Sequence, residues 1–520
     1  MVWSRGEYGR FLPSRQLADL LIDAYLRTFE SVLRVLHIPS FRREYDIMWQ
    51  QTSAASSHFI VQVQLCLALG AGLYDDTFSL RGQALQWIQE AMAWVHSSEK
   101  SSLSISGIQN MCLLELARRN THEIHGGRCW VRSGVLIRSA MLIGLHRDPG
   151  GLPGILPAQA EIRRRLWTTV LELTLSSSLD AGCPPLISLD DFDCALPNNL
   201  DDDLLDLTSD SDLIARDDRH LTDTSLQIAI ARTLPDRLAI TKLTNGIKSE
   251  ALYPQILSSS AAFKNTCRML NDSLRRLVPQ PTSFQRLYCE MTMCRYIFTL
   301  HIPYIAVSAK NPTFLQSRSG CFDAALNFAH SALNSPLLPD PLLESIRSAT
   351  GAEAPCEDFS RLVLCGLGPF RSVPYQAVMI IGAELSRTSI DNPETSYSDA
   401  TSTRNIRSLE LSLLLRVGVE WTKHRLRAGQ DNIKDCVILS AALACANASL
   451  EGTLVSDAVE SGGLEGSLEA KALLTQLVTN GDLVAEGLES LPDSGGGSCA
   501  LDDFWTADLS GYDGFFIPFE

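Results

Sequence analysis

Apolar residues recur at every third or fourth position along most of this sequence, whereas the strict alternation of half-buried strands is hard to find. In the first such stretch Ser14 is the expected N-cap, and we expect the helix to reach about Leu36 and Pro39 to stop it. Its expected buried face consists of Leu17, Leu20, Leu21, Ala24 and Tyr25. This periodicity predicts an all-α fold, with one large multi-helix body over about 12–450.

The same spacing predicts helices over 128–145 and from about 158 onward. The expected buried face of the later helix consists of Ile162, Leu166, Val170 and Leu173. Arg163, Arg164 and Arg165 flank that face, so we expect them to be solvated or ion-paired. Beyond this helix, structure-breaking residues and many aspartates crowd 190–218, which predicts a loop or a domain boundary.

The charge of the chain excludes a dominant nucleic-acid-binding surface. Lys and Arg number 44 against 60 Asp and Glu, which gives a net charge of -16, the wrong sign for a chain that grips phosphates unaided. The longest apolar runs have about ten residues, too few for a membrane span. Since no secretory signal is recognisable, we expect the 14 cysteines to be reduced and mostly small core residues.

Catalytic motifs fail on spacing. Gly70-Ala71-Gly72 lacks the third glycine of a dinucleotide loop, because Asp75 stands in its place. His122 and His125 are three positions apart rather than the four of a zinc-protease helix, and a surface loop is expected there. The sequence has no Gly-x-Ser-x-Gly elbow and no phosphate-binding Gly-Lys-Ser/Thr loop. We therefore expect no catalytic, cofactor-binding or metal-binding residues, and no enzyme activity.

Four segments carry more information. The first has His37-Ile-Pro39-Ser-Phe41 after an apolar helix, and the second runs from Trp130 to Gly144-Leu-His146-Arg147-Asp148. The third joins Arg164-Arg165-Leu166-Trp167 to Pro184-Pro185 and Asp193-Cys-Ala-Leu-Pro197, and the fourth places His301-Ile-Pro303 before Ser317-Arg318. In order and spacing they resemble the fungal-specific transcription factor domain, the "middle homology" region of fungal binuclear-zinc-cluster transcription factors.

The resemblance implies a helical regulatory domain over 12–335, with 336–471 as a helical extension of the same body. It implies motif residues that hold structure rather than ligand. His146 and Arg147 would bring two cations to the carbonyls at a helix end, and Asp148 would order the next turn. His301 and Pro303 are expected in a turn, and Trp167 is expected in the core.

Members of this family usually begin with six cysteines, in two Cys-x-x-Cys groups, that bind two zinc ions and aim a helix at DNA. This sequence contains no Cys-x-x-Cys pair and no basic run that would serve as a DNA-docking or nuclear import signal. We therefore expect no cofactor in this chain. DNA would be reached through a segment upstream of Met1 or through a partner protein, and the sequence does not separate these alternatives.

The last segment, 472–520, has nine acidic residues and no Lys, Arg or His. Beyond Gly495-Gly496-Gly497, acids are interleaved with large aromatic residues, of which we assign five to activation: Phe504, Trp505, Tyr512, Phe515 and Phe516. This pattern is typical of a flexible acidic activation segment that recruits coactivators. The alternative is a terminus that packs its aromatic rings back onto the body.

The sequence therefore predicts a nuclear transcription regulator of the fungal zinc-cluster type, controlling a metabolic or specialised-metabolite gene set. We expect a homo- or heterodimer that responds to a small-molecule effector and has no membrane segment. One alternative is an interaction or effector-sensing protein with the same helical body but no DNA binding of its own. Another is a small-molecule-binding protein or enzyme on an all-helical scaffold.

Overall fold

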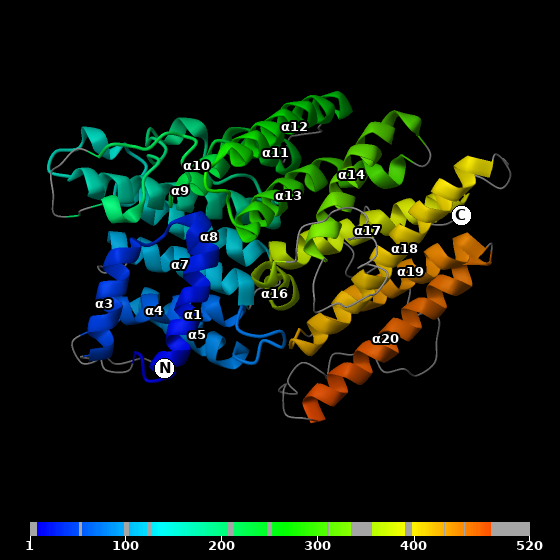
Figure 1. The fold of residues 1–520 in the computed structure, drawn as a ribbon, viewed down its shortest axis with the longest axis horizontal. Coiled ribbons are helices and arrows are strands. Elements are labelled where there is room, and N and C mark those ends of the chain that lie inside the picture. The colour runs from blue at the N-terminus through cyan, green and yellow to red at the C-terminus, as the bar shows by residue number, and fades with distance from the viewer. Residues whose placement is uncertain are drawn as a thin grey trace. The chain divides into compact units, whose positions relative to one another are not determined.

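The computed structural model describes residues 8–50, 55–97, 103–121, 126–205, 207, 213–246, 252–308, 311–333, 356–390, 398–430, 432–451 and 453–479. Within these ranges the chain consists of helices joined by turns and loops, and the one β-type pairing is an isolated bridge between His220 and Val278 (Figure 1). The all-α prediction is confirmed. None of the helices in these ranges has an apolar window long enough to cross a membrane.

The chain divides into two compact units, which are described separately. Unit 1 comprises Met1–Tyr296 and Cys356–Arg371, and unit 2 comprises Ile297–Pro355 and Ser372–Glu520. The periodicity predicted a single body, because it shows which face of a helix is buried but not which helices pack together. The boundaries of the two units do not coincide with the domain boundary expected at 335/336. The division into a domain over 12–335 and an extension over 336–471 stays a prediction.

Unit 1 holds the helices of the N-terminal half and one short helix from later in the chain. They are α1 (Arg15–Tyr25), the π-helical η1 (Leu26–Glu30), α2 (Ser31–Leu33), α3 (Ile38–Gln50), α4 (Ser57–Ala71), α5 (Arg81–Ser97), α7 (Ile105–Thr121), α8 (Gly126–Leu142), η3 (Pro149–Gly151), α9 (Pro157–Asp180), η4 (Leu189–Asp191), η5 (Asp202–Leu204), α10 (Ser225–Ala231), α11 (Leu234–Asn245), α12 (Tyr253–Arg276) and α16 (Glu357–Cys365).

Unit 2 holds the later helices. They are η6 (Pro312–Phe314), α14 (Leu315–Ala332), α18 (Ser398–Arg427), α19 (Lys434–Glu451) and α20 (Val455–Thr479). Two helices have residues in both units, since the boundary falls inside them: α13 (Ser283–Val307) and α17 (Pro369–Ile390).

The centre of unit 1 is α4, which packs against α1, α5 and α7 (Figure 1). Nearly every side chain of α4 from Phe59 onward is buried, because neighbours cover it on all sides. At Gly70 a Cβ atom would lie 2.1 Å from the backbone oxygen of Leu21. Only glycine therefore permits the close approach of α1 and α4.

The first helix differs from its prediction beyond the confirmed N-cap, where the Ser14 hydroxyl accepts a hydrogen bond from the Leu17 N–H. Leu20 is 55% exposed, because the buried face centres on Leu21 and Tyr25 and Leu20 points about 100° away from its neighbour. A π-helical stretch interrupts the helix, which ends at Leu33 rather than Leu36. Pro39 is the second residue of α3, a position where a missing N–H costs little.

The segment that we expected to be flexible, 472–520, starts inside a helix. Residues 472–479 belong to α20, because Leu473, Leu474 and Leu477 pack onto the apolar cluster that α18, α19 and α20 share. The segment had been delimited by its lack of basic residues, and that criterion takes no account of the helical spacing of these leucines. Residues 480–520 lie outside the described residues, and so do all five aromatic residues assigned to activation: Phe504, Trp505, Tyr512, Phe515 and Phe516.

Candidate functional site

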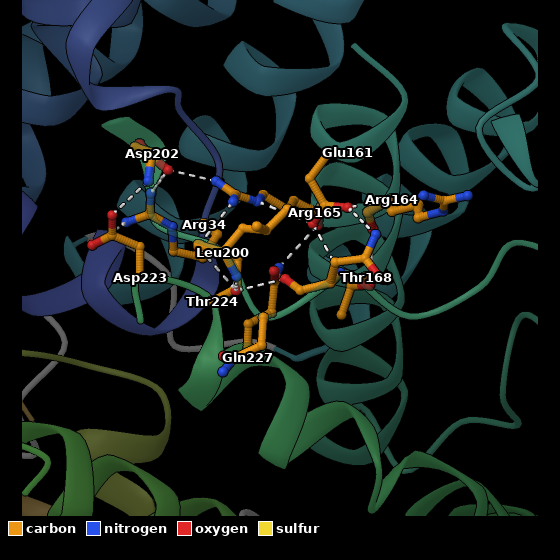
Figure 2. A network of polar contacts seen from close by, with 12 residues as sticks. Arg34, Glu161, Arg164, Arg165, Thr168, Leu200, Asp202, Asp223, Thr224 and Gln227 are labelled. Carbon is orange, nitrogen blue, oxygen red and sulfur yellow. Dashed lines mark hydrogen bonds and ion pairs between the residues drawn. The ribbon is translucent and has the colours of Figure 1, made fainter. Parts of the chain in front are cut away.

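The first and third motif segments meet at Asp202, inside unit 1 (Figure 2). Asp202 is 3% exposed and lies in η5, within the aspartate-rich loop. Its carboxylate pairs with Arg34, which follows α2, and with Arg165 of α9, both buried. It also accepts a 2.8 Å hydrogen bond from the Ile38 N–H. The loop is therefore an interior ion-pair centre and not the domain boundary that the sequence suggested.

The backbone at Arg34 explains how the guanidinium reaches this position. Arg34 has a φ of 54°, in the left-handed region, which ends α2 and turns the chain toward α3. This turn leaves the Leu33 carbonyl without a helical partner, and it accepts hydrogen bonds from Gln227 Nε2 at 2.8 Å and from Thr169 Oγ1. Gln227 also donates to the Arg165 carbonyl at 2.9 Å (Figure 2). Three helices are thereby joined at one point.

The electrostatics of this centre are coupled. Burial by itself would raise the pKa of Asp202, but Arg34 and Arg165 together hold it below its ordinary value. Nearby, burial raises the pKa of Glu30 to about 7, although Arg34 and hydrogen bonds from Tyr25 and the Leu36 N–H oppose that rise. Ionised Asp202 is therefore the main counter-ion of the two arginines.

His37 and Phe41 flank the same centre. The His37 ring lies 3.2 Å from the Asp202 carbonyl through Nε2 and 2.8 Å from Ser40 Oγ through Nδ1. Phe41 is buried against Phe59, with ring centroids 5.6 Å apart. The His-x-Pro-x-Phe segment therefore positions the end of α2 against the loop that carries Asp202.

A second centre joins the second and third motif segments at Asp148. Its carboxylate accepts two hydrogen bonds from Arg164, at 2.9 and 3.1 Å, and one each from the backbone of Gly150 and Ala195. These bonds, led by those from Arg164, lower the pKa of Asp148 to about 2. Asp148 also caps η3, so it does order the next turn.

Neither His146 nor Arg147 supplies the cation that contacts a carbonyl after the end of α8, although the sequence had indicated both. Gly144 has a φ of 77° and turns the chain away from the helix axis. Arg147 then pairs with Asp193, at 2.9 Å, and His146 Nδ1 has no hydrogen-bond partner. It is Arg163 of α9 that donates to the Ile143 carbonyl, at 2.8 Å.

The remaining motif residues of unit 1 are packing contacts. Trp167 is 1% exposed and meets Phe192 edge-on, with ring centroids 5.6 Å apart. It lines a cavity of about 40 Å³, room for no more than a few water molecules. Trp130 Nε1 donates to the Pro184 carbonyl at 3.1 Å. Leu166 and Pro197 are buried and Pro185 is half-buried.

The fourth motif segment lies in unit 2. The buried His301 ring is 2.9 Å from Ser317 Oγ through Nδ1, and Arg318 makes two hydrogen bonds to Glu384, at 2.7 and 2.9 Å. The expected turn at His301 and Pro303 is wrong, because α13 continues through Pro303. Inside a helix a proline removes one backbone hydrogen bond and crowds the carbonyl one turn earlier, a cost that the packing of a long helix can offset.

Arg34, Asp202 and Gln227 were missed by sequence reasoning. The one signal for Asp202 was the aspartate cluster itself, but helical spacing cannot show which of its carboxylates is buried. Across the described ranges no group of three or more His, Cys, Asp and Glu side chains is placed to hold a metal ion. A larger, open pocket of about 340 Å³ borders His37, Phe41 and Arg163 and offers room for a ligand.

Comparison with known proteins adds the family. Residues 22–266 match the fungal specific transcription factor domain. Transcription factor lepE of Aspergillus flavus is 33% identical over 476 residues, which cover 88% of this chain and 55% of lepE. The aspyridones cluster regulator apdR of Emericella nidulans is 29% identical over 353 residues, 66% of this chain and 46% of apdR.

The Zn(2)-C6 fungal-type transcription factor mpsB of Macrophomina phaseolina is 25% identical over 337 residues, 61% of this chain and 44% of mpsB. The chain thus spans about half the length of these relatives. No solved structure matches it. The domain match lies in unit 1 and contains both ion-pair centres, and the chain therefore belongs to the family of proteins that carry the fungal-specific transcription factor domain.

Proposed function

We propose that this chain is a transcription regulator of the fungal zinc-cluster type, controlling a metabolic or specialised-metabolite gene set. The observation that carries the proposal is the alignment of 88% of the chain with a protein named as a transcription factor. A relative named as the regulator of a cluster supports the kind of target. The nucleus is the location that this function requires.

In this proposal the helical units regulate and do not catalyse. The motif residues of unit 1 satisfy one another through the ion pairs at Asp202 and Asp148, which supports a structural role for them. DNA is reached through a segment outside this sequence or through a partner, and the chain acts as a homo- or heterodimer. The acidic segment recruits coactivators, and a small-molecule effector changes the activity.

A reporter assay tests the proposal. The full chain is fused to a foreign DNA-binding domain, beside a matched fusion that ends at Thr479 and the foreign domain alone. We expect activation from the full fusion and strong loss of it from the shortened one. Equal activity of all three would refute activation by this chain.

A second experiment tests regulation without a fusion. Transcripts are compared between a strain with the intact gene and one lacking it, and we expect a defined biosynthetic gene set to fall. Recovery of the chain on chromatin only when a second zinc-cluster protein is present would favour the interaction protein. An unchanged transcript profile under conditions where the chain is produced would refute the regulator.

A further inference from the structure

Unit 1 contains an open pocket of about 340 Å³ between α3, α4, α7 and α9. This volume lies in the range of pockets that hold small organic ligands. The pocket has apolar walls, formed by Phe41, Phe59, Ile105, Ile155 and Ile162 among others. Such walls suit a ligand with an apolar body.

Arg163 lines the same pocket and differs from the two arginines that follow it. Arg164 pairs with Asp148 and Arg165 pairs with Asp202. Among the described residues, no carboxylate lies within ion-pair distance of Arg163, which donates to the Ile143 carbonyl instead. Its Nε atom is buried without a hydrogen-bond partner.

The surroundings of Arg163 make this arrangement costly without a counter-ion. Burial lowers its pKa, because the half-buried guanidinium has lost part of its hydration. By contrast, Asp148 raises the pKa of Arg164, one residue along. A half-buried guanidinium that no carboxylate neutralises is compensated by an anionic oxygen ligand, for which its planar fork is suited.

The other polar groups of the pocket narrow the class of ligand. Gln62 is 6% exposed and lines the pocket. Its amide makes no hydrogen bond to the described residues, whereas the amide of Gln109 donates to the Val35 carbonyl. Glu44 stands exposed at the same pocket, and its charge disfavours a ligand with a second negative group.

We propose that this pocket binds a small amphipathic monocarboxylate, with its carboxylate on Arg163 and its apolar body against Phe41 and Phe59. The inference deepens the effector role in the proposed function and rests on that function only for the regulatory consequence. Binding itself is a property of the purified chain. Its failure in calorimetry would leave the reporter results standing, and failure of the reporter would leave the binding result standing.

The test is calorimetric titration of the purified full chain with decanoate, beside 1-decanol as the uncharged control. We expect saturable binding of decanoate and binding of 1-decanol weaker by about 10-fold, the loss of one charge-assisted contact. Arg163→Gln should weaken decanoate by a similar factor. The matched control is Arg43→Gln on α3, an exposed arginine outside the pocket lining, which should leave the affinity unchanged.

A second variant guards against a folding defect in Arg163→Gln. Ser106→Phe fills the pocket from the start of α7 and leaves Arg163 in place, so it should abolish decanoate binding with a wild-type circular dichroism spectrum and melting temperature. Equal affinity for decanoate and 1-decanol, or equal weakening by Arg163→Gln and Arg43→Gln, would overturn the carboxylate assignment. Unchanged decanoate binding by folded Ser106→Phe would overturn the location.

Discussion

Removing the charge of Asp202 tests the interior ion-pair centre most directly. In Asp202→Asn the shape of the side chain stays nearly constant, but Arg34 and Arg165 lose the carboxylate between them. The neighbouring Asp203 is exposed in the same short turn, so Asp203→Asn removes one equal charge from the same place in the sequence. The two variants therefore remove the same charge, once from a buried, ion-paired carboxylate and once from an exposed one.

The structure sets the expected magnitude. Breaking a buried ion pair by removing one partner costs about 3–5 kcal/mol. Two features favour the lower end of this range: asparagine keeps one acceptor oxygen, and Glu161 and Asp223 lie 3.4 Å from Arg165 and 3.9 Å from Arg34. We expect Asp202→Asn to lower the free energy of unfolding by about 3 kcal/mol, and Asp203→Asn to change it by no more than about 0.5 kcal/mol.

Urea unfolding of the purified chain, followed by circular dichroism, measures both values. The pH dependence is a second readout. Because the folded state lowers the pKa of Asp202, its contribution is present above the unfolded value near 3.9 and is lost as the pH falls through the folded value. The difference between wild type and Asp202→Asn should therefore stay constant from pH 7 to 5 and shrink below about pH 4. Equal effects of the two variants, or a difference that shrinks between pH 7 and 5, would refute the reasoning.

Four further predictions concern other parts of the chain. Trp167→Ala should destabilise by about 3–5 kcal/mol in thermal unfolding, since Trp167 is buried; a loss below about 1 kcal/mol would contradict a core role. Gly462→Ala should destabilise by about 1–2 kcal/mol, because its Cβ would lie 2.5 Å from that of Ala444. At Gly463 the nearest atom to an added Cβ lies 3.8 Å away, so Gly463→Ala should stabilise by about 0.5–1 kcal/mol through helix propensity. If urea unfolding gave the opposite order for the two variants, α19 and α20 would not pack this closely. Burial raises the pKa of Glu290 to about 7, so the free energy of unfolding of the wild type should fall as the pH rises from about 4.5 to 7. Glu290→Gln should have a free energy of unfolding about 1–3 kcal/mol above that of wild type between pH 5 and 8. Parallel curves of unfolding free energy against pH would contradict this. Alanine at Trp505, Phe515 and Phe516 together should abolish activation in the reporter fusion with an unchanged melting temperature, whereas a loss of several degrees would show that these rings pack onto the body.

The helices were predictable because each requires only a local pattern. The Ser14 cap and the buried positions Leu21 and Tyr25 follow from residues within one or two turns of each other. The pattern failed where a distant group decided the outcome. Leu473 and Leu474 lie in a stretch without basic residues, and only the apolar cluster beside Ala470 shows that the helix continues there.

The candidate site was predictable only as a set of motif segments. The order of the motif segments along the chain identified His37, Asp148 and Trp167, but not the residues that they contact. Three consecutive arginines show this best. Arg163 lines an open pocket, whereas Arg164 pairs with Asp148 and Arg165 pairs with Asp202. Successive residues of a helix point about 100° apart, so each meets a different neighbour.

The sequence by itself determined the helical class, the acidic character and the family of this protein, because periodicity, composition and motif order are all properties of the chain in one dimension. The tertiary structure decided which charges are buried, which aspartate of the loop at 201–203 pairs with two arginines, and which arginine lines a pocket. Those outcomes depend on desolvation and on pairing between residues as far apart as Arg34 and Asp202, and both are set only when the helices pack.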